Sequence, residues 1–233
     1  MLLKVASVSK SFGRNLVLAD VGFSVRRGEV LGLIGPNGSG KTTLFECLAG
    51  LMPVESGEVQ FEDRTLAPSA RKQALFYMPD GIRPWADQSL RWLLGFFEKL
   101  YGRPEDESAA LAKSLQLEAF MDTRVGALSK GELKRALLAV GLSTPHPLLL
   151  LDEPFDGLDF RQTRDVMELL RSYPSKGRTL FLSIHQLADA ACVCDRLVLL
   201  SKGRVAGEGS LAELQAAAGH AEGSLEEIFL ALT

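Results

Sequence analysis

The hydrophobic pattern of the chain predicts β-strands of two kinds. Apolar and polar residues alternate over residues 2–8 and 17–25, with the two-residue period of a half-buried strand. Continuous apolar runs, typical of strands covered on both faces of a sheet, occupy residues 30–34, 148–151, 179–184 and 196–200. Shorter strands are predicted at residues 58–61, 74–78 and 205–206. The early strands are expected to pair antiparallel, because the links between them are too short for a helical crossover.

A helical spacing of apolar residues predicts most of the remaining elements. It is clearest between residues 89 and 101 and recurs at 107–115 and 133–142, so residues 83–143 are expected to form a helical insert. Further helices are predicted at residues 43–49, 162–171, 211–218 and 225–232. Strands that alternate with helices predict an α/β fold with an open, mainly parallel sheet, preceded by an antiparallel β subdomain and interrupted by the α-helical one.

We therefore expect a single domain with three parts. Residues 1–82 and 144–210 form the α/β core with its β subdomain, residues 83–143 the helical subdomain, and residues 211–233 a helical tail. The length of 233 residues is appropriate for one large domain of this kind.

Composition and charge narrow the possible functions. Hydrophobic residues make up 46% of the chain and charged residues 24%, which is ordinary for a globular protein with a hydrophobic core. The formal net charge of −3 gives no electrostatic reason to expect a nucleic-acid partner. No apolar run approaches the roughly 18 residues of a membrane span, and the N-terminus lacks the pattern of a signal peptide. A cytoplasmic location is therefore expected, and the three cysteines, Cys47, Cys192 and Cys194, fit that compartment.

A phosphate-binding loop is the strongest chemical signal. It follows the predicted strand at residues 30–34 and reads Gly35-Pro36-Asn37-Gly38-Ser39-Gly40-Lys41-Thr42. Its glycines allow backbone N–H groups to point at phosphate oxygens, and the following helix adds the positive end of its dipole. Lys41 can reach the terminal phosphates, and Thr42 can ligate Mg²⁺. The plainer alternative is a glycine-rich turn that leads into a helix.

Acidic and histidine side chains follow two of the buried strands. Asp152 and Glu153 come directly after the run at residues 148–151, and His185 follows the strand at residues 179–184. Ligand sites in α/β sheets gather at these carboxyl ends. Asp152 can hold Mg²⁺, Glu153 can polarise an attacking water as general base, and His185 can bond the γ-phosphate. The structural alternatives are an acidic loop start and a histidine that only supports packing.

A helix start at Ser129 offers a second anion site. Ser129 and Glu132 have the spacing of a capping box, so the plain interpretation is a helix cap. A capped helix start beside Gly131 also exposes N–H groups to phosphate. One chain has no need of two such sites for one nucleotide, whereas a head-to-tail dimer does.

These motifs, in this order, resemble the nucleotide-binding domain of ATP-binding cassette proteins over nearly the whole chain. The resemblance is carried by the phosphate loop, Leu128-Ser129-Lys130-Gly131-Glu132, the apolar run that ends in Asp152-Glu153-Pro154, Gly157-Leu158-Asp159 and His185. It implies ATP and Mg²⁺ as cofactors, held between two subunits of a head-to-tail dimer.

The resemblance also assigns roles residue by residue. It implies that Phe12 stacks on adenine and that Gly35 to Thr43 hold the phosphates. Ser129 and Gly131 match the signature that closes on the γ-phosphate of the partner subunit. Asp159 matches the loop that crosses the dimer interface, and His185 matches the switch histidine.

Three positions depart from the family's usual residues. Asp80 stands where glutamine is usual, Lys130 where glycine is commonest, and Glu132 where glutamine is commonest. Asp80 either ligates Mg²⁺ with its carboxylate or lies in a surface turn without that contact. Lys130 is expected to be solvated, and Glu132 still serves the capping box.

Three functions fit these expectations. The leading hypothesis is the ATPase subunit of a membrane transporter, on the cytoplasmic face of the inner membrane, with a separate transmembrane permease subunit as partner. The tail resembles that of small bacterial exporter subunits. The alternatives are an ATPase of this family without a membrane partner, such as those of iron–sulfur assembly, and a regulatory subunit that hydrolyses ATP poorly because of Asp80 and Lys130.

Overall fold

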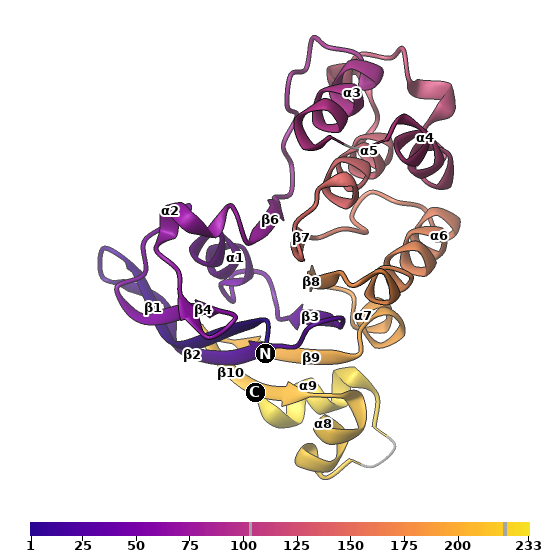
Figure 1. The fold of residues 1–233 in the computed structure, drawn as a ribbon. Helices are drawn as coiled ribbons and strands as arrows, with labels where there is room; N and C mark the ends of the chain where they lie inside the picture. The colour runs from indigo at the N-terminus through magenta and orange to yellow at the C-terminus, as the bar shows by residue number, and fades with distance from the viewer. Residues whose placement is uncertain (103, 221–222) are drawn as a thin grey trace.

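Two sheets and the helices around them form the structure, a computed structural model that describes residues 1–102, 104–220 and 223–233 (Figure 1). Among these residues, none of the helices has the length and apolar character needed to cross a membrane. The α/β class predicted from the sequence is confirmed.

The larger sheet has six strands in the order β10-β9-β3-β8-β7-β6. Their bounds are β3 Val30–Ile34, β6 Leu75–Met78, β7 Leu148–Asp152, β8 Thr179–Ile184, β9 Arg196–Ser201 and β10 Arg204–Gly209. Strands β9, β3, β8, β7 and β6 pair in parallel, and only β10 adds antiparallel to this sheet. The mainly parallel sheet is therefore as predicted, with β8 between β3 and β7.

The smaller sheet is antiparallel and has four strands in the order β2-β1-β4-β5. Their bounds are β1 Leu3–Phe12, β2 Asn15–Val25, β4 Ser56–Phe61 and β5 Arg64–Thr65. β1 continues well beyond the alternating stretch that predicted it. Its pairing with β2 shifts register between Val5 and Val8, where Ser7 has a positive φ of 53°. An irregularity of this kind interrupts the two-residue period, so the pattern ends before the strand does.

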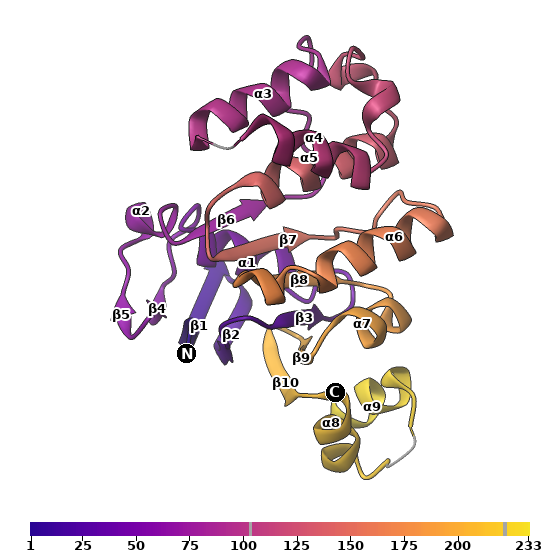
Figure 2. The ribbon, with the colours of Figure 1, turned by 45° about the vertical axis from the view of Figure 1, so that its right-hand side comes forward.

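Helices flank the larger sheet, and further helices lie beyond its two edge strands (Figures 1 and 2). Their bounds are α1 Lys41–Ala49, α2 Pro68–Arg71, α3 Leu90–Tyr101, α4 Glu105–Ser114, α5 Lys130–Ser143, α6 Phe160–Arg171, α7 Leu187–Val193, α8 Leu211–Ala218 and α9 Leu225–Leu232, with 3₁₀ turns at η1 Glu118–Phe120, η2 Val125–Ala127 and η3 Pro174–Lys176. Helices α3, α4 and α5 gather at one end of the molecule and α8 and α9 at the other. The helices predicted within residues 83–143 are confirmed, and the division into three parts stays a prediction.

Both faces of the larger sheet are buried, in two separate cores. Leu148 and Leu150 of β7 face a core that contains α1 and the strands of the smaller sheet. Leu149 and Leu151, which point to the opposite face, join a core that contains residues of α5, α6 and α7. The continuous apolar run therefore reflects a strand covered on both sides.

We expect Leu150→Ala to lower the free energy of unfolding by about 2–5 kcal/mol, because it removes buried contacts and leaves a cavity in a fully covered strand. Denaturant titration measures this loss. Leu230→Ala, at an exposed leucine of α9, is the matched control and should change stability by less than about 0.5 kcal/mol. Equal losses for the two variants would contradict this placement of the core.

Candidate functional site

The phosphate loop lies between β3 and α1, where close packing requires glycine. A Cβ atom added to Gly35 would lie 2.3 Å from the Leu200 carbonyl oxygen and 2.5 Å from Ser39 Oγ. Gly40 has a φ of +104°, a conformation that residues with a side chain rarely adopt. Gly35 and Gly40 therefore allow the loop a backbone conformation that residues with a side chain would not tolerate at these two positions.

Lys41 folds over this loop and faces the acidic end of β7. Its Nζ donates hydrogen bonds to the carbonyl oxygens of Gly35 at 2.7 Å and Pro36 at 3.4 Å. The same Nζ lies 3.9 Å from Oε1 of Glu153. The side chain is 7% exposed, so its positive charge is held at the mouth of the loop rather than in bulk solvent.

Asp152 accepts hydrogen bonds from hydroxyl groups on three other elements. Thr42 donates to Oδ2 at 3.0 Å, Ser183 donates to Oδ1, and Tyr77 donates to Oδ2 at 3.4 Å. Burial, and then the charge of Asp152, raise the pKa of Tyr77, so the phenol stays protonated and remains a donor. The carboxylate is 1% exposed. An oxygen-rich pair of Thr42 and Asp152 fits the ligand preference of Mg²⁺.

Glu153 and His185 form a direct pair beside this carboxylate. His185 Nδ1 lies 2.7 Å from Glu153 Oε2. The Glu153 backbone has a φ of +48°, and its N–H donates to the Ser183 carbonyl and, at 3.1 Å, to Ser183 Oγ. A positive φ is uncommon for a residue with a side chain, and such conformations cluster at functional sites. Because β8 lies between β3 and β7, the sheet order brings together the phosphate loop, His185 and Glu153.

The remaining predicted residues occupy helix starts and a hairpin. Ser129 and Glu132 form the predicted capping box at the start of α5, and Asp159 forms one with Gln162 at the start of α6. Phe12, at the end of β1, is 48% exposed. Both Ser129 and Asp159 are also exposed, as residues that contact another subunit would have to be before assembly.

Both Asp80 and Lys130 make ion pairs within the chain. Asp80 Oδ1 lies 2.6 Å from Nζ of Lys134 on α5, so its carboxylate is engaged with that helix. Lys130 Nζ lies 2.5 Å from Asp156 Oδ2, in the turn after β7. The hydrogen bond between them raises the pKa of Lys130 and lowers that of Asp156. Lys130 is exposed, in agreement with a solvated side chain, and it is also ion-paired, because the turn after β7 packs against the start of α5.

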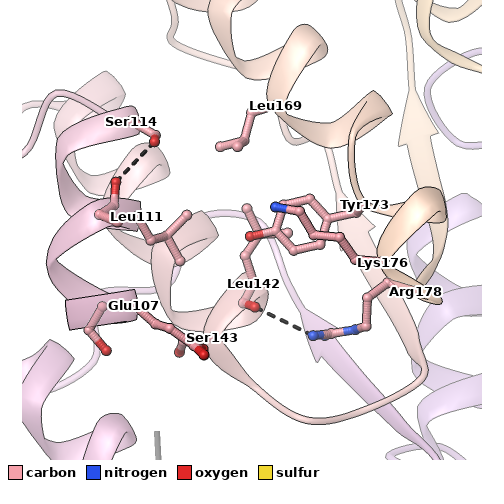
Figure 3. A pocket seen from close by; sticks show the side chains of 11 residues that line it. Glu107, Leu111, Ser114, Leu142, Ser143, Leu169, Tyr173, Lys176 and Arg178 are labelled. Carbon is pink, nitrogen blue, oxygen red and sulfur yellow. Dashed lines mark hydrogen bonds between the residues drawn. The ribbon is translucent and has the colours of Figure 1, made fainter. Parts of the chain in front are cut away.

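A pocket of about 450 Å³ lies apart from these residues (Figure 3). It is bounded by α4, the end of α5, α6 and η3, and its polar lining includes Ser114, Tyr173, Lys176 and Arg178. Arg178 donates a hydrogen bond to the Leu142 carbonyl oxygen at 3.5 Å. None of the residues predicted for the site lines this pocket.

Three side chains that contact predicted site residues were not identified from the sequence: Tyr77 and Ser183, which bond Asp152, and Lys134, which pairs with Asp80. Ser183 is a polar residue inside a buried apolar strand, and Lys134 is a lysine among buried residues of α5. Buried polar groups need partners, so each of these two could have been noticed as an exception to its local pattern. The partner itself could not have been identified from the pattern.

The fold and the site together define a phosphate-loop NTPase. A family model described as ABC transporter matches residues 18–156. The chain is 35% identical over 212 residues to a Nod factor export ATP-binding protein I of Burkholderia lata, covering 88% of this chain and 69% of that protein. It is 34% identical to a hemin import ATP-binding protein HmuV of Rhodococcus jostii, covering 91% of this chain and 76% of that protein.

A solved structure described as the ATP binding subunit of an ABC transporter is also similar. It superposes with a TM-score of 0.91 at 31% sequence identity, and the match covers 100% of this chain and 99% of the chain in that structure. The chain belongs to the ATP-binding cassette family, as an ATP-binding domain with ATPase activity.

We expect Ser183→Ala to lower the kcat of ATP hydrolysis about tenfold or more and to change ATP binding little. The substitution removes the hydroxyl that bonds both Asp152 and the Glu153 N–H, and a buried group left without its partner costs about 1–3 kcal/mol. Steady-state phosphate release and nucleotide titration separate the two effects. Ser175→Ala, at an exposed serine bonded only to a local carbonyl, is the control. Wild-type kcat in Ser183→Ala would contradict a positioning role for this hydroxyl.

Proposed function

We propose that this chain hydrolyses ATP as one half of a head-to-tail pair and thereby drives a separate transmembrane permease subunit, in the direction of export. The observation that carries the catalytic part is one continuous row of side chains. Lys41 lies 3.9 Å from Glu153, and Glu153 lies 2.7 Å from His185, beside the loop that would hold the phosphates. Phosphoryl transfer depends on positioning and on charge stabilisation, which this row supplies.

In this proposal the loop from Gly35 to Thr43 binds the phosphates, and Phe12 stacks on adenine. Glu153 orients the attacking water as general base, and its short contact with His185 fixes the direction of the carboxylate. Lys41 and His185 stabilise the charge that develops on the transferred group. Their positions at neighbouring strand ends support these roles.

Thr42 and Asp152 would hold Mg²⁺, which, when bound, supplies positive charge against the phosphate oxygens. Their oxygens already lie 3.0 Å apart, which supports a shared ligand. Asp80 is the other ligand that the sequence suggests, but its carboxylate is engaged with Lys134. The dependence of the Asp80→Asn variant on Mg²⁺ concentration distinguishes a metal contact from the ion pair alone.

The second half of the site would come from another subunit, either an identical chain or a closely related one. Ser129 and Gly131 at the start of α5 would close on the γ-phosphate held by the partner, and Asp159 would lie in the loop that crosses the dimer interface. Helix starts carry unsatisfied N–H groups and a positive dipole end, which favour phosphate. The exposed positions of Ser129 and Asp159 support this arrangement.

The transport part of the proposal is supported by relatives. The Burkholderia lata relative is named for export and the Rhodococcus jostii relative for import, so an importer is the second candidate. The tail resemblance noted in the sequence favours export. A location on the cytoplasmic face of the inner membrane follows from a permease partner. An ATPase of this family without such a partner, and a poorly hydrolysing regulatory subunit, are the alternatives that experiments must exclude.

We expect Glu153→Gln to reduce phosphate release about 100-fold or more, because it removes the proposed general base, while ATP binding is retained. The amide has nearly the shape of the carboxylate, so the fold should be preserved. Steady-state hydrolysis and equilibrium binding of ATP measure the two properties. Glu46→Gln, at a glutamate of α1, is the comparison for a nearby carboxylate. Undiminished hydrolysis in Glu153→Gln would refute this assignment.

Co-purification from membranes tests the transport proposal. A tagged chain expressed with its native partners should retain a protein that has several apolar segments of about 20 residues each. ATP hydrolysis should then change when that partner is present in lipid vesicles. Recovery of the chain without any membrane protein, together with unchanged hydrolysis, would favour the alternative without a membrane partner.

A further inference from the structure

Two lysines at the start of α5 hold the loops that follow two neighbouring strands. Lys130 and Lys134 are four residues apart, so they lie on the same side of the helix. Lys134 pairs with Asp80, just after β6, and Lys130 pairs with Asp156, in the turn after β7. We call these four residues the α5 ion-pair cluster. It unites Asp80 and Lys130, two of the three positions at which the sequence departs from the family's usual residues.

The pair of Lys134 and Asp80 is the buried part of this cluster. The Lys134 side chain is 4% exposed and that of Asp80 39% exposed. A buried ammonium group is strongly unfavourable unless it is paired, so Asp80 is the group that makes this lysine tolerable on α5. The contact of 2.6 Å is a charge-assisted hydrogen bond, which is stronger than a neutral one. Asp80 is therefore held toward α5 by an interaction that is costly to break.

Packing around Lys130 fixes the second loop. A Cβ atom added to Gly157 would lie 2.7 Å from Cγ of Lys130, so the lysine stem covers this glycine. A Cβ atom added to Gly131 would lie 2.7 Å from the Gly157 carbonyl oxygen. The start of α5 is thus pressed against the turn that runs from Glu153 to Asp159. This close packing makes the position of the turn depend on that of Gly131.

We propose that the α5 ion-pair cluster positions the signature segment, and that Asp80 and Asp156 act through Lys134 and Lys130 rather than by touching nucleotide or metal. This inference rests on the proposed composite site. The turn after β7 carries Glu153, which serves the nucleotide of its own subunit, whereas Ser129 serves that of the partner. The cluster consequently connects the catalytic carboxylate of one site to the segment that closes the other.

A double-mutant cycle on the buried pair tests this assignment. Asp80→Asn and Lys134→Met keep the approximate volumes and remove one charge each. Each single variant is expected to lower kcat about fivefold to twentyfold, and the double variant should be no slower than the slower single variant, because partners in one interaction are not additive. The KM for ATP and the Mg²⁺ concentration at half-maximal rate should stay within about twofold of wild type, since binding uses the phosphate loop.

Two results would overturn the proposal. If Asp80→Asn raises the half-saturating Mg²⁺ concentration and Lys134→Met does not, Asp80 is a metal ligand instead. If the single variants keep wild-type kcat, or if their effects simply add in the double variant, the pair does not position the signature.

The exposed pair provides an independent cycle if Lys134→Met does not fold. Lys130→Gly and Asp156→Asn alter side chains that are 62% and 32% exposed, so both variants should still fold. We expect the same pattern of lower kcat with unchanged KM, and no further loss in the double variant. The matched control is Arg91→Gln, at the start of α3, which breaks the exposed ion pair of Arg91 with Asp122. We expect wild-type kcat in this variant. Equal kcat in the Lys130→Gly and Arg91→Gln variants would contradict the proposal.

Ser129→Ala separates failure of this inference from failure of the proposed function. If Ser129→Ala leaves hydrolysis unchanged, the composite site itself is wrong. If Ser129→Ala lowers kcat and none of the four single cluster variants lowers it, only the positioning role is wrong.

Discussion

The hydrogen bonds that three hydroxyl groups donate to Asp152 are the interaction on which the site depends. They come from α1, β6 and β8, and they meet at a carboxylate that is almost completely buried. A buried charge of this kind is stable only when its oxygens are satisfied. The need to satisfy Asp152 therefore fixes the phosphate-loop helix relative to the ends of three parallel strands. Glu153 and His185 take their places on this framework.

Parallel strands explain why the chemistry gathers at one edge. Each of β3, β7 and β8 is covered on both faces, so none can carry polar side chains along its length without cost. Polar residues appear where the strands end, and the order of the sheet makes those ends adjacent. In our proposal, the start of α5 carries a second set of phosphate-binding groups, which serve the nucleotide of the partner subunit.

Much of this arrangement follows from local pattern. The buried strands, α3, α5 and the glycine-rich loop have periodicities or spacings that local sequence specifies, and they were predicted within a few residues. The bulged continuation of β1 and the short helix α7 were not, because a register shift and a seven-residue helix leave little periodic signal. The contacts of Tyr77, Ser183 and Lys134 lie beyond local pattern altogether. Each depends on segments far apart in sequence, and Lys134 meets Asp80 only when α5 packs beside the end of β6.

Mixing two inactive variants tests the composite site most directly. Lys41→Ala disables the phosphate loop and Ser129→Ala disables the signature, so a homodimer of either should hydrolyse little ATP. In a mixed dimer one site combines an intact loop with an intact signature. The account predicts that mixing the two proteins restores hydrolysis to about a quarter of the wild-type rate, since half of the dimers would contain one working site of two. A mixture no more active than the sum of its parts, with both variants folded and able to dimerise with wild type, would contradict it.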